Sequence, residues 1–117
     1  MAVSENYRAF ILEQLGAVLP GVRARSMFGG VGVYSADQFF ALLDNDTLYF
    51  KVDGVTRPGF EALGMGPFRP FGDGGEMMQY YEVSADVIED RDALSQWAED
   101  AVAVARRTKS RKPRRTP

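Results

Sequence analysis

The sequence predicts an α+β domain of two layers, in which helices cover one face of an antiparallel sheet. Apolar residues recur at helical spacing after Ser4 and again after Asp92. Between them, the stretch from Arg23 to Lys51 is rich in β-branched and aromatic residues and is broken by two turn signals. The predicted order of elements is α-β-β-β-α-β-β-α.

The first helix is predicted to begin near Ser4, because a serine hydroxyl accepts hydrogen bonds from the free N–H groups of a first helical turn. Glu5 adds a negative charge at the positive end of the helix dipole. An apolar stripe at helical spacing follows, made of Tyr7, Phe10, Ile11, Leu15 and Val18. Pro20 and Gly21 are turn residues, and we expect them to end this helix.

Three strands are expected next, at roughly 25–34, 38–43 and 47–52. The segments SADQ and DND separate them and are typical of turns. In the third strand, apolar side chains alternate with Tyr49 and Lys51. This alternation predicts one buried and one wetter face.

The second half of the chain predicts a short helix, a loop, one or two strands and a long helix. The short helix covers 55–63, and the segment from Gly64 to Gly75 is an irregular loop with a short extended piece at 68–71. A strand follows at 77–83, in which Tyr80 and Tyr81 point to opposite faces, so we expect one buried and one exposed ring. The last helix has an inner stripe of Leu94, Trp97, Ala98, Ala101, Val102 and Ala105, with Trp97 as a core anchor.

The composition excludes several classes of function. The chain has no cysteine and no histidine, so thiolate chemistry, imidazole catalysis and Cys/His zinc sites are absent. The longest apolar runs fall short of the roughly 18 residues that a membrane span needs, and the N-terminus does not resemble a secretion signal. We therefore expect a cytoplasmic protein that binds no cofactor, no metal and no membrane.

Charge is distributed unevenly along the 117 residues. Positions 1–105 hold seven basic and 16 acidic residues, while the last 12 positions hold seven basic residues and no acid. Those seven are Arg106, Arg107, Lys109, Arg111, Lys112, Arg114 and Arg115. We expect a domain over residues 1–107 and a disordered basic tail over 108–117. The tail either grips nucleic-acid phosphates without base specificity or only aids solubility.

The segment MFGGVGVYSADQFFALL invites a phosphate-loop interpretation, which fails on spacing. A dinucleotide-binding turn needs a third glycine where Ser35 stands, and a hairpin rather than a helix follows. We expect these glycines to permit a bulge or a close approach of strands. Asp44, Asn45 and Asp46 likewise form a poor calcium loop, because an EF-hand would place glycine at the position of Tyr49.

An enzyme stays open as a further alternative. Asp73, Glu76 and Glu82 lie in or near the loop from Gly64 to Gly75, and Lys51 is the other candidate group. General acid–base catalysis by a carboxylate would need a buried acid with a raised pKa. The enzyme interpretation therefore predicts a deep cavity beside this loop with a buried, unpaired acid.

Four segments resemble the TfoX N-terminal domain family, part of the Sxy/TfoX competence regulators. They are VRARSMFGGVGVYSADQFFALL, LYFKVD, FRPF and YYEVSADVIEDRDALSQWAEDAVAVAR. The resemblance covers Tyr7 to Arg107, and its most specific motif is R-x-M-F-G-G-x-G, from Arg25 to Gly32.

This resemblance implies a small α+β domain of the secretion-chaperone-like type without catalytic residues. Long members of the family regulate transcription of DNA-uptake genes together with a cyclic-AMP receptor protein and carry a second, helical domain. The present chain has no room for that domain, so we expect a stand-alone N-terminal module. The motif residues, which we expect to shape a structural corner rather than to contact a ligand, are Arg25, Met27, Phe28, Gly29, Gly30 and Gly32.

Three hypotheses follow. The first is a non-enzymatic regulatory module that binds an unidentified protein partner, with a homodimer formed through an exposed sheet face or edge as one form of it. The second is a nucleic-acid-associated protein whose basic tail supplies affinity. The third is an enzyme that uses a carboxylate or Lys51.

Overall fold

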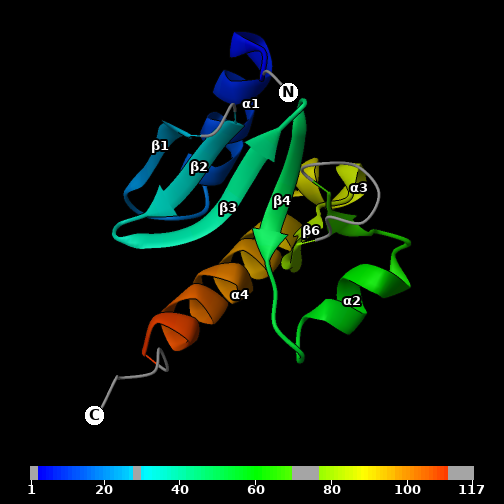
Figure 1. Ribbon diagram of the computed structural model, residues 1–117. Helices are drawn as coiled ribbons and strands as arrows, with labels where there is room; N and C mark the ends of the chain where they lie inside the picture. Colours follow the sequence, from blue (N-terminus) through cyan, green and yellow to red (C-terminus); the bar gives the residue numbers. More distant parts are fainter. Residues whose placement is uncertain (1–2, 28–29, 70–76, 111–117) are drawn as a thin grey trace.

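An antiparallel sheet is the centre of the fold. We describe it from a computed structural model, which covers residues 3–27, 30–69 and 77–110. Within these residues the sheet has six strands in the order β1-β2-β3-β4-β6-β5 (Figure 1). The strands are β1 (Val22–Met27), β2 (Gly30–Ser35), β3 (Gln38–Asp44), β4 (Thr47–Lys51), β5 (Pro67–Phe68) and β6 (Met77–Glu82). The helices are α1 (Glu5–Gly16), α2 (Arg57–Ala62), α3 (Ala85–Ile88) and α4 (Arg91–Ser110).

The predicted α+β class is confirmed, while two details of the predicted order are wrong. The expected strand over 25–34 is two strands, because Met27 pairs with Gly30 and the chain reverses between them. A short helix, α3, lies before the last helix, and the Ser84 side chain caps it by accepting from the Asp86 N–H. The last helix continues to Ser110, which lies three residues beyond the expected end of the domain.

The first helix begins where its cap was predicted. The Ser4 hydroxyl accepts a hydrogen bond of 3.1 Å from the Tyr7 N–H, which satisfies one of the free donors of the first turn. Ile11 and Leu15 of this helix are fully buried. The helix thus packs its inner stripe against the sheet and α4.

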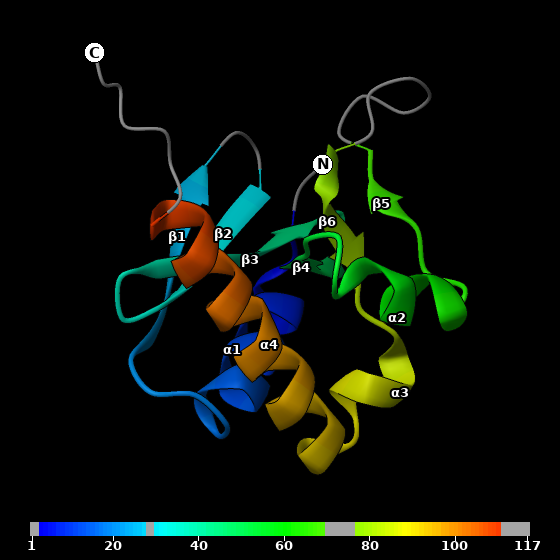
Figure 2. The same cartoon turned by 90° about the horizontal axis from the view of Figure 1, so that it is seen from below.

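Helices α1 and α4 lie side by side on the same face of the sheet (Figure 2). Fully buried rings and aliphatic side chains from β3 and β4 meet the inner stripe of α4, where Leu94 and Ala98 are also buried. Trp97 is half-buried and packs edge-on against Phe60 of α2, with ring centroids 4.7 Å apart. Trp97 therefore joins α2 to α4 at the margin of the core.

The expectation that one of Tyr80 and Tyr81 is exposed is wrong. Tyr81 points into the core and is 2% exposed, while Tyr80 points to the opposite face and is still only 5% exposed. The Phe39 ring lies 6.1 Å from the Tyr80 ring, and the Lys51 ammonium lies 5.1 Å from its centre. Neighbouring side chains cover Tyr80, so the second face of the sheet has an aromatic layer of its own.

Candidate functional site

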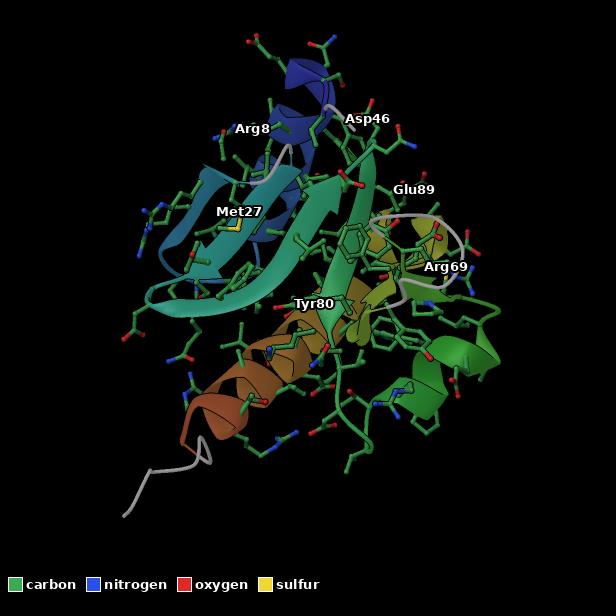
Figure 3. All side chains as sticks on the ribbon, viewed as in Figure 1. Arg8, Met27, Asp46, Arg69, Tyr80 and Glu89 are labelled. Carbon is green, nitrogen blue, oxygen red and sulfur yellow. The ribbon has the colours of Figure 1, made fainter. Side chains whose placement is uncertain are left out.

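Four residues of the family motif, Arg25, Met27, Gly30 and Gly32, lie on β1 and β2, on the face of the sheet turned away from α4. Arg25 pairs with Gly32 and Met27 pairs with Gly30 across the two strands. Met27 lies on the same face as Tyr80 (Figure 3). Phe28 and Gly29 lie outside the described residues.

Two motif glycines occupy positions where a side chain would collide with a neighbour. A Cβ on Gly30 would stand 2.6 Å from the Leu43 carbonyl oxygen. A Cβ on Gly32 would stand 2.7 Å from the Met27 methyl carbon and 3.1 Å from the Phe39 ring. The expected close approach of neighbouring atoms is therefore present at Gly30 and Gly32, and packing explains why these two positions hold glycine. The structural-corner role of the motif as a whole stays a prediction.

A line of rings and cations crosses this same face. The Arg23 guanidinium lies 4.8 Å from the centre of the Tyr34 ring, and the Tyr34 and Phe39 rings stack with centroids 5.1 Å apart. Burial raises the pKa of Tyr80 to about 12, with a smaller contribution from Tyr34, and lowers the pKa of Lys51. Tyr80 is buried within this line, whereas the Tyr34 and Phe39 side chains are partly exposed.

A groove on another side of the molecule has a different character. A cavity of about 290 Å³ lies between α1, α3 and the ends of β4 and β6. Its apolar lining includes Tyr7, Phe10, Leu48, Val83, Ala85 and Ile88, and its carboxylates are Asp46, Glu82 and Glu89. We call this feature the acidic groove; Asp46 and Glu89 lie on the same side of the molecule (Figure 3). Phe10 is 43% exposed although it is a large apolar residue, so the groove offers an aromatic surface to solvent.

The carboxylates of the acidic groove have few polar partners among the residues that the structure describes. One Asp46 carboxylate oxygen accepts a 2.7 Å hydrogen bond from the Ser4 N–H. Within the described part of the chain, no basic side chain forms an ion pair with Asp46, Glu82 or Glu89. Burial, and then the negative charges of Asp46 and Glu82, raise the pKa of Tyr7 to about 12. The groove thus places three carboxylates beside an aromatic surface.

A second cavity of about 290 Å³ bears on the enzyme alternative. It lies between the end of β4, α2 and α4, and it is lined by Lys51, Thr56, Trp97 and Asp100 among others. Asp100 is exposed and accepts a hydrogen bond from the Gln96 side chain. Ser35 is the sole buried polar side chain of the described residues, so the predicted buried acid is not among them. Asp73 and Glu76 fall outside the described residues.

Two further findings limit what the described residues can do. They contain no group of three or more acidic side chains placed to hold a metal ion. Asn45 and Asp46 instead form the turn of the β3–β4 hairpin, with φ values of 53° at both residues. No helix in the described part of the chain is long and apolar enough to cross a membrane.

Three of the basic residues predicted to contact nucleic acid lie near the C-terminal end of α4, at the opposite end of the molecule from the acidic groove. Arg106 and Arg107 are exposed near the end of α4, and one Arg107 guanidinium nitrogen lies 2.7 Å from an Asp53 carboxylate oxygen. Lys109 is also within α4. The other four, Arg111, Lys112, Arg114 and Arg115, lie outside the described residues. Figure 1 shows the end of α4 at the lower left, away from α1 and α3.

No pattern in the sequence predicts the acidic groove. Tyr7 and Phe10 fit the apolar stripe of a helix, and Asp46 fits a hairpin turn, so each has a local explanation. The acid-rich segment from Ser84 to Asp92 was the one local signal. Only the fold brings these three parts of the chain together.

Known proteins share this domain. Residues 13–105 match the family model described as the TfoX N-terminal domain. A segment of 45 residues is 42% identical to DNA transformation protein TfoX1 of Aliivibrio fischeri. That segment is 38% of this chain and 22% of the relative, so the match spans about a fifth of the relative's length.

Proposed function

The chain belongs to the TfoX N-terminal domain family, and from this premise we propose that it is a non-enzymatic regulatory module of DNA transformation that binds a protein partner. The single observation that supports a protein partner is the acidic groove, with its apolar lining and its three carboxylates. The name of the matched relative supports the link to transformation.

The chemistry of the groove favours an arginine-bearing segment of that partner. A guanidinium is planar, so it stacks on rings such as those of Tyr7 and Phe10. It also donates two parallel hydrogen bonds to a carboxylate such as Glu82 or Glu89. A lysine ammonium carries the same charge but is not planar, so a segment with lysine in place of arginine should bind less tightly.

A direct test measures binding of a fluorescent probe peptide of alternating arginine and leucine by anisotropy. We expect Glu89→Gln to weaken binding by about 3- to 10-fold, because it removes one charge-assisted contact at a partly exposed site. Glu13→Gln is the matched control, since Glu13 is exposed and lies outside the groove. A lysine-for-arginine version of the probe should bind more weakly. Equal loss with Glu89→Gln and Glu13→Gln would contradict the proposal.

The link to transformation needs a test in cells. In a strain that lacks this gene, the wild-type chain should restore transcription of DNA-uptake genes. The double variant Glu82→Gln and Glu89→Gln should fail to restore it, whereas Glu13→Gln should succeed. Wild-type complementation without any change in these transcripts would contradict a role in transformation.

Nucleic-acid binding is a second candidate, favoured by the exposed Arg106 and Arg107 at the basic end of α4. If all seven basic residues after position 105 engaged duplex DNA, log K would fall with log salt at a slope of about −6. Anisotropy of a duplex and a single strand over a salt series would measure this slope. Replacing Arg111, Lys112, Arg114 and Arg115 by glutamine should lower affinity for both and flatten the slope. Unchanged binding would remove this candidate.

A further inference from the structure

The acidic groove and the C-terminal end of α4, which the basic segment 111–117 follows in the sequence, lie at opposite ends of the molecule. Glu89 of the groove comes two residues before α4 begins at Arg91, whereas the segment 111–117 follows the other end of that helix, at Ser110. Figure 1 shows this separation, with α3 on the right and the C-terminal end of α4 at the lower left. The two features have opposite charge: three carboxylates line the groove, and four of the seven residues of the segment are basic.

The covalent reach of the chain prevents these features from meeting within one molecule. Helix α4 has 20 residues, so its length is about 30 Å at 1.5 Å per residue. Residues 111–117, fully extended, span at most about 25 Å. Because residue 111 follows Ser110 at the C-terminal end of α4, even residue 117 cannot reach the N-terminal end of that helix, beside Glu89. A groove filled by this segment must therefore belong to another molecule.

We propose that the acidic groove of one copy binds the basic segment 111–117 of a second copy. The inference rests on the proposed function, because it takes arginine as the side chain that the groove recognises. Arg111, Arg114 and Arg115 supply the guanidinium groups that stack on exposed rings and pair with Glu82 and Glu89. Apart from two prolines, segment 111–117 contains only basic and polar residues, so charge and stacking provide most of the affinity, and salt should weaken it.

Mutual exchange of segments gives a closed dimer with two equivalent contacts. A two-fold axis relates the copies when each segment enters the other groove. The second contact forms at a high effective concentration once the first is made. An arginine-bearing partner must then displace a segment from a groove, so self-association would hold the module inactive until a partner competes for the same site.

Sedimentation or light scattering of the full chain over a concentration series tests the dimer against the monomer mass of 13.0 kDa. The groove variant combines Glu82→Gln and Glu89→Gln, and the segment variant combines Arg111→Gln, Arg114→Gln and Arg115→Gln. We expect each to weaken self-association by at least about tenfold. The control Glu13→Gln with Glu99→Gln removes the same charge as the groove variant and should dimerise like the wild type. Equal midpoints of urea unfolding would show that each variant is folded.

Mixing the two variants gives the sharpest result. The groove variant keeps an intact segment, and the segment variant keeps an intact groove. The mixture should therefore form heterodimers at lower concentrations than either variant alone forms homodimers. A wild type that stays monomeric at every concentration would overturn the inference, as would self-association lost only in the segment variant. Loss only in the groove variant would overturn it too.

A labelled peptide of residues 106–117 separates this inference from the proposed function. Binding that depends on Glu82 and Glu89 supports both. If the peptide fails while the arginine–leucine probe binds in the groove, the inference is wrong and the proposed function stands. If neither binds there, both fail.

Discussion

Single residues show how closely local sequence determines packing in this fold. The cap at Ser4 and the close approach at Gly30 were predictable, because each follows from the chemistry of one residue type. The burial of Tyr80 was not predictable from alternation along a strand. Alternation decides the face on which a ring lies, while Phe39 and Lys51, distant in sequence, decide whether that ring is covered.

Gly30 should tolerate no side chain. In Gly30→Ala the new Cβ would meet the Leu43 carbonyl oxygen, which belongs to a paired strand and has little freedom to move. We expect the free energy of unfolding to fall by about 1–3 kcal/mol, as in other overpacked sites. Urea unfolding followed by circular dichroism measures it.

Gly16→Ala is the matched control. Gly16 is the last residue of α1, and a Cβ there would have no neighbouring atom within 4 Å. Alanine at this position should therefore raise the free energy of unfolding or leave it unchanged. Equal destabilisation at Gly16 and Gly30 would contradict the packing explanation.

Asp53 should contribute to stability only above acidic pH. The hydrogen bond from Arg107 holds its pKa at about 2, with help from the Thr56 and Val55 N–H groups. Since the pKa in the folded state is below the ordinary value of 3.8, this stabilisation is fully present above that value and is lost as the pH falls through about 2. The ion pair is partly exposed, with side chains 47% and 25% accessible, so its own share is below about 1 kcal/mol.

Asp53→Asn tests this dependence. The difference in unfolding free energy between wild type and variant should be constant near neutral pH and should shrink between about pH 4 and 2. Denaturant unfolding at a series of pH values gives this difference directly. A difference that is independent of pH would show that the Asp53 charge contributes nothing.

At the scale of whole elements, periodicity located most helices and strands but not every chain reversal. The region 22–35 is rich in β-forming residues on both sides of its glycines, so composition alone did not distinguish one strand from two. The pairing of Met27 with Gly30 shows that there are two strands, and strand pairing depends on the whole sheet rather than on local composition. Helix α3 was not predicted, because a helix of a single turn is too short to show a helical period in its apolar residues.

Helix α2 should depend on one ring for its attachment. Phe60 is 4% exposed and contacts Trp97 of α4 and Tyr81 of β6, with ring centroids at 4.7 and 6.2 Å. Phe60→Ala should lower the free energy of unfolding by about 3–5 kcal/mol. Leu63→Ala, beside the same helix but 46% exposed, should change it by less than about 1 kcal/mol. Fluorescence of Trp97, the one tryptophan, reports the unfolding, and similar losses in both variants would contradict this role.

At the scale of the whole molecule, the fold brings together acidic side chains that lie far apart in the sequence. The sequence showed an acidic body and a basic tail, and the basic part was predictable as a contiguous run. The acidic groove could not be predicted, because it joins α1, the β3–β4 turn and the β6–α3 region, which are far apart in sequence. A binding site assembled from three distant segments leaves no local motif.

The most direct measurement is a titration of the isotope-labelled full chain with the arginine–leucine probe peptide, followed by amide NMR shifts. We expect the largest shift changes at Tyr7, Phe10, Asp46, Glu82 and Glu89, with little change at Arg25 or Gly32 on the other face. Shift changes absent from the acidic groove, or confined to the end of α4, would contradict the claim that this groove is the partner-binding site of the module.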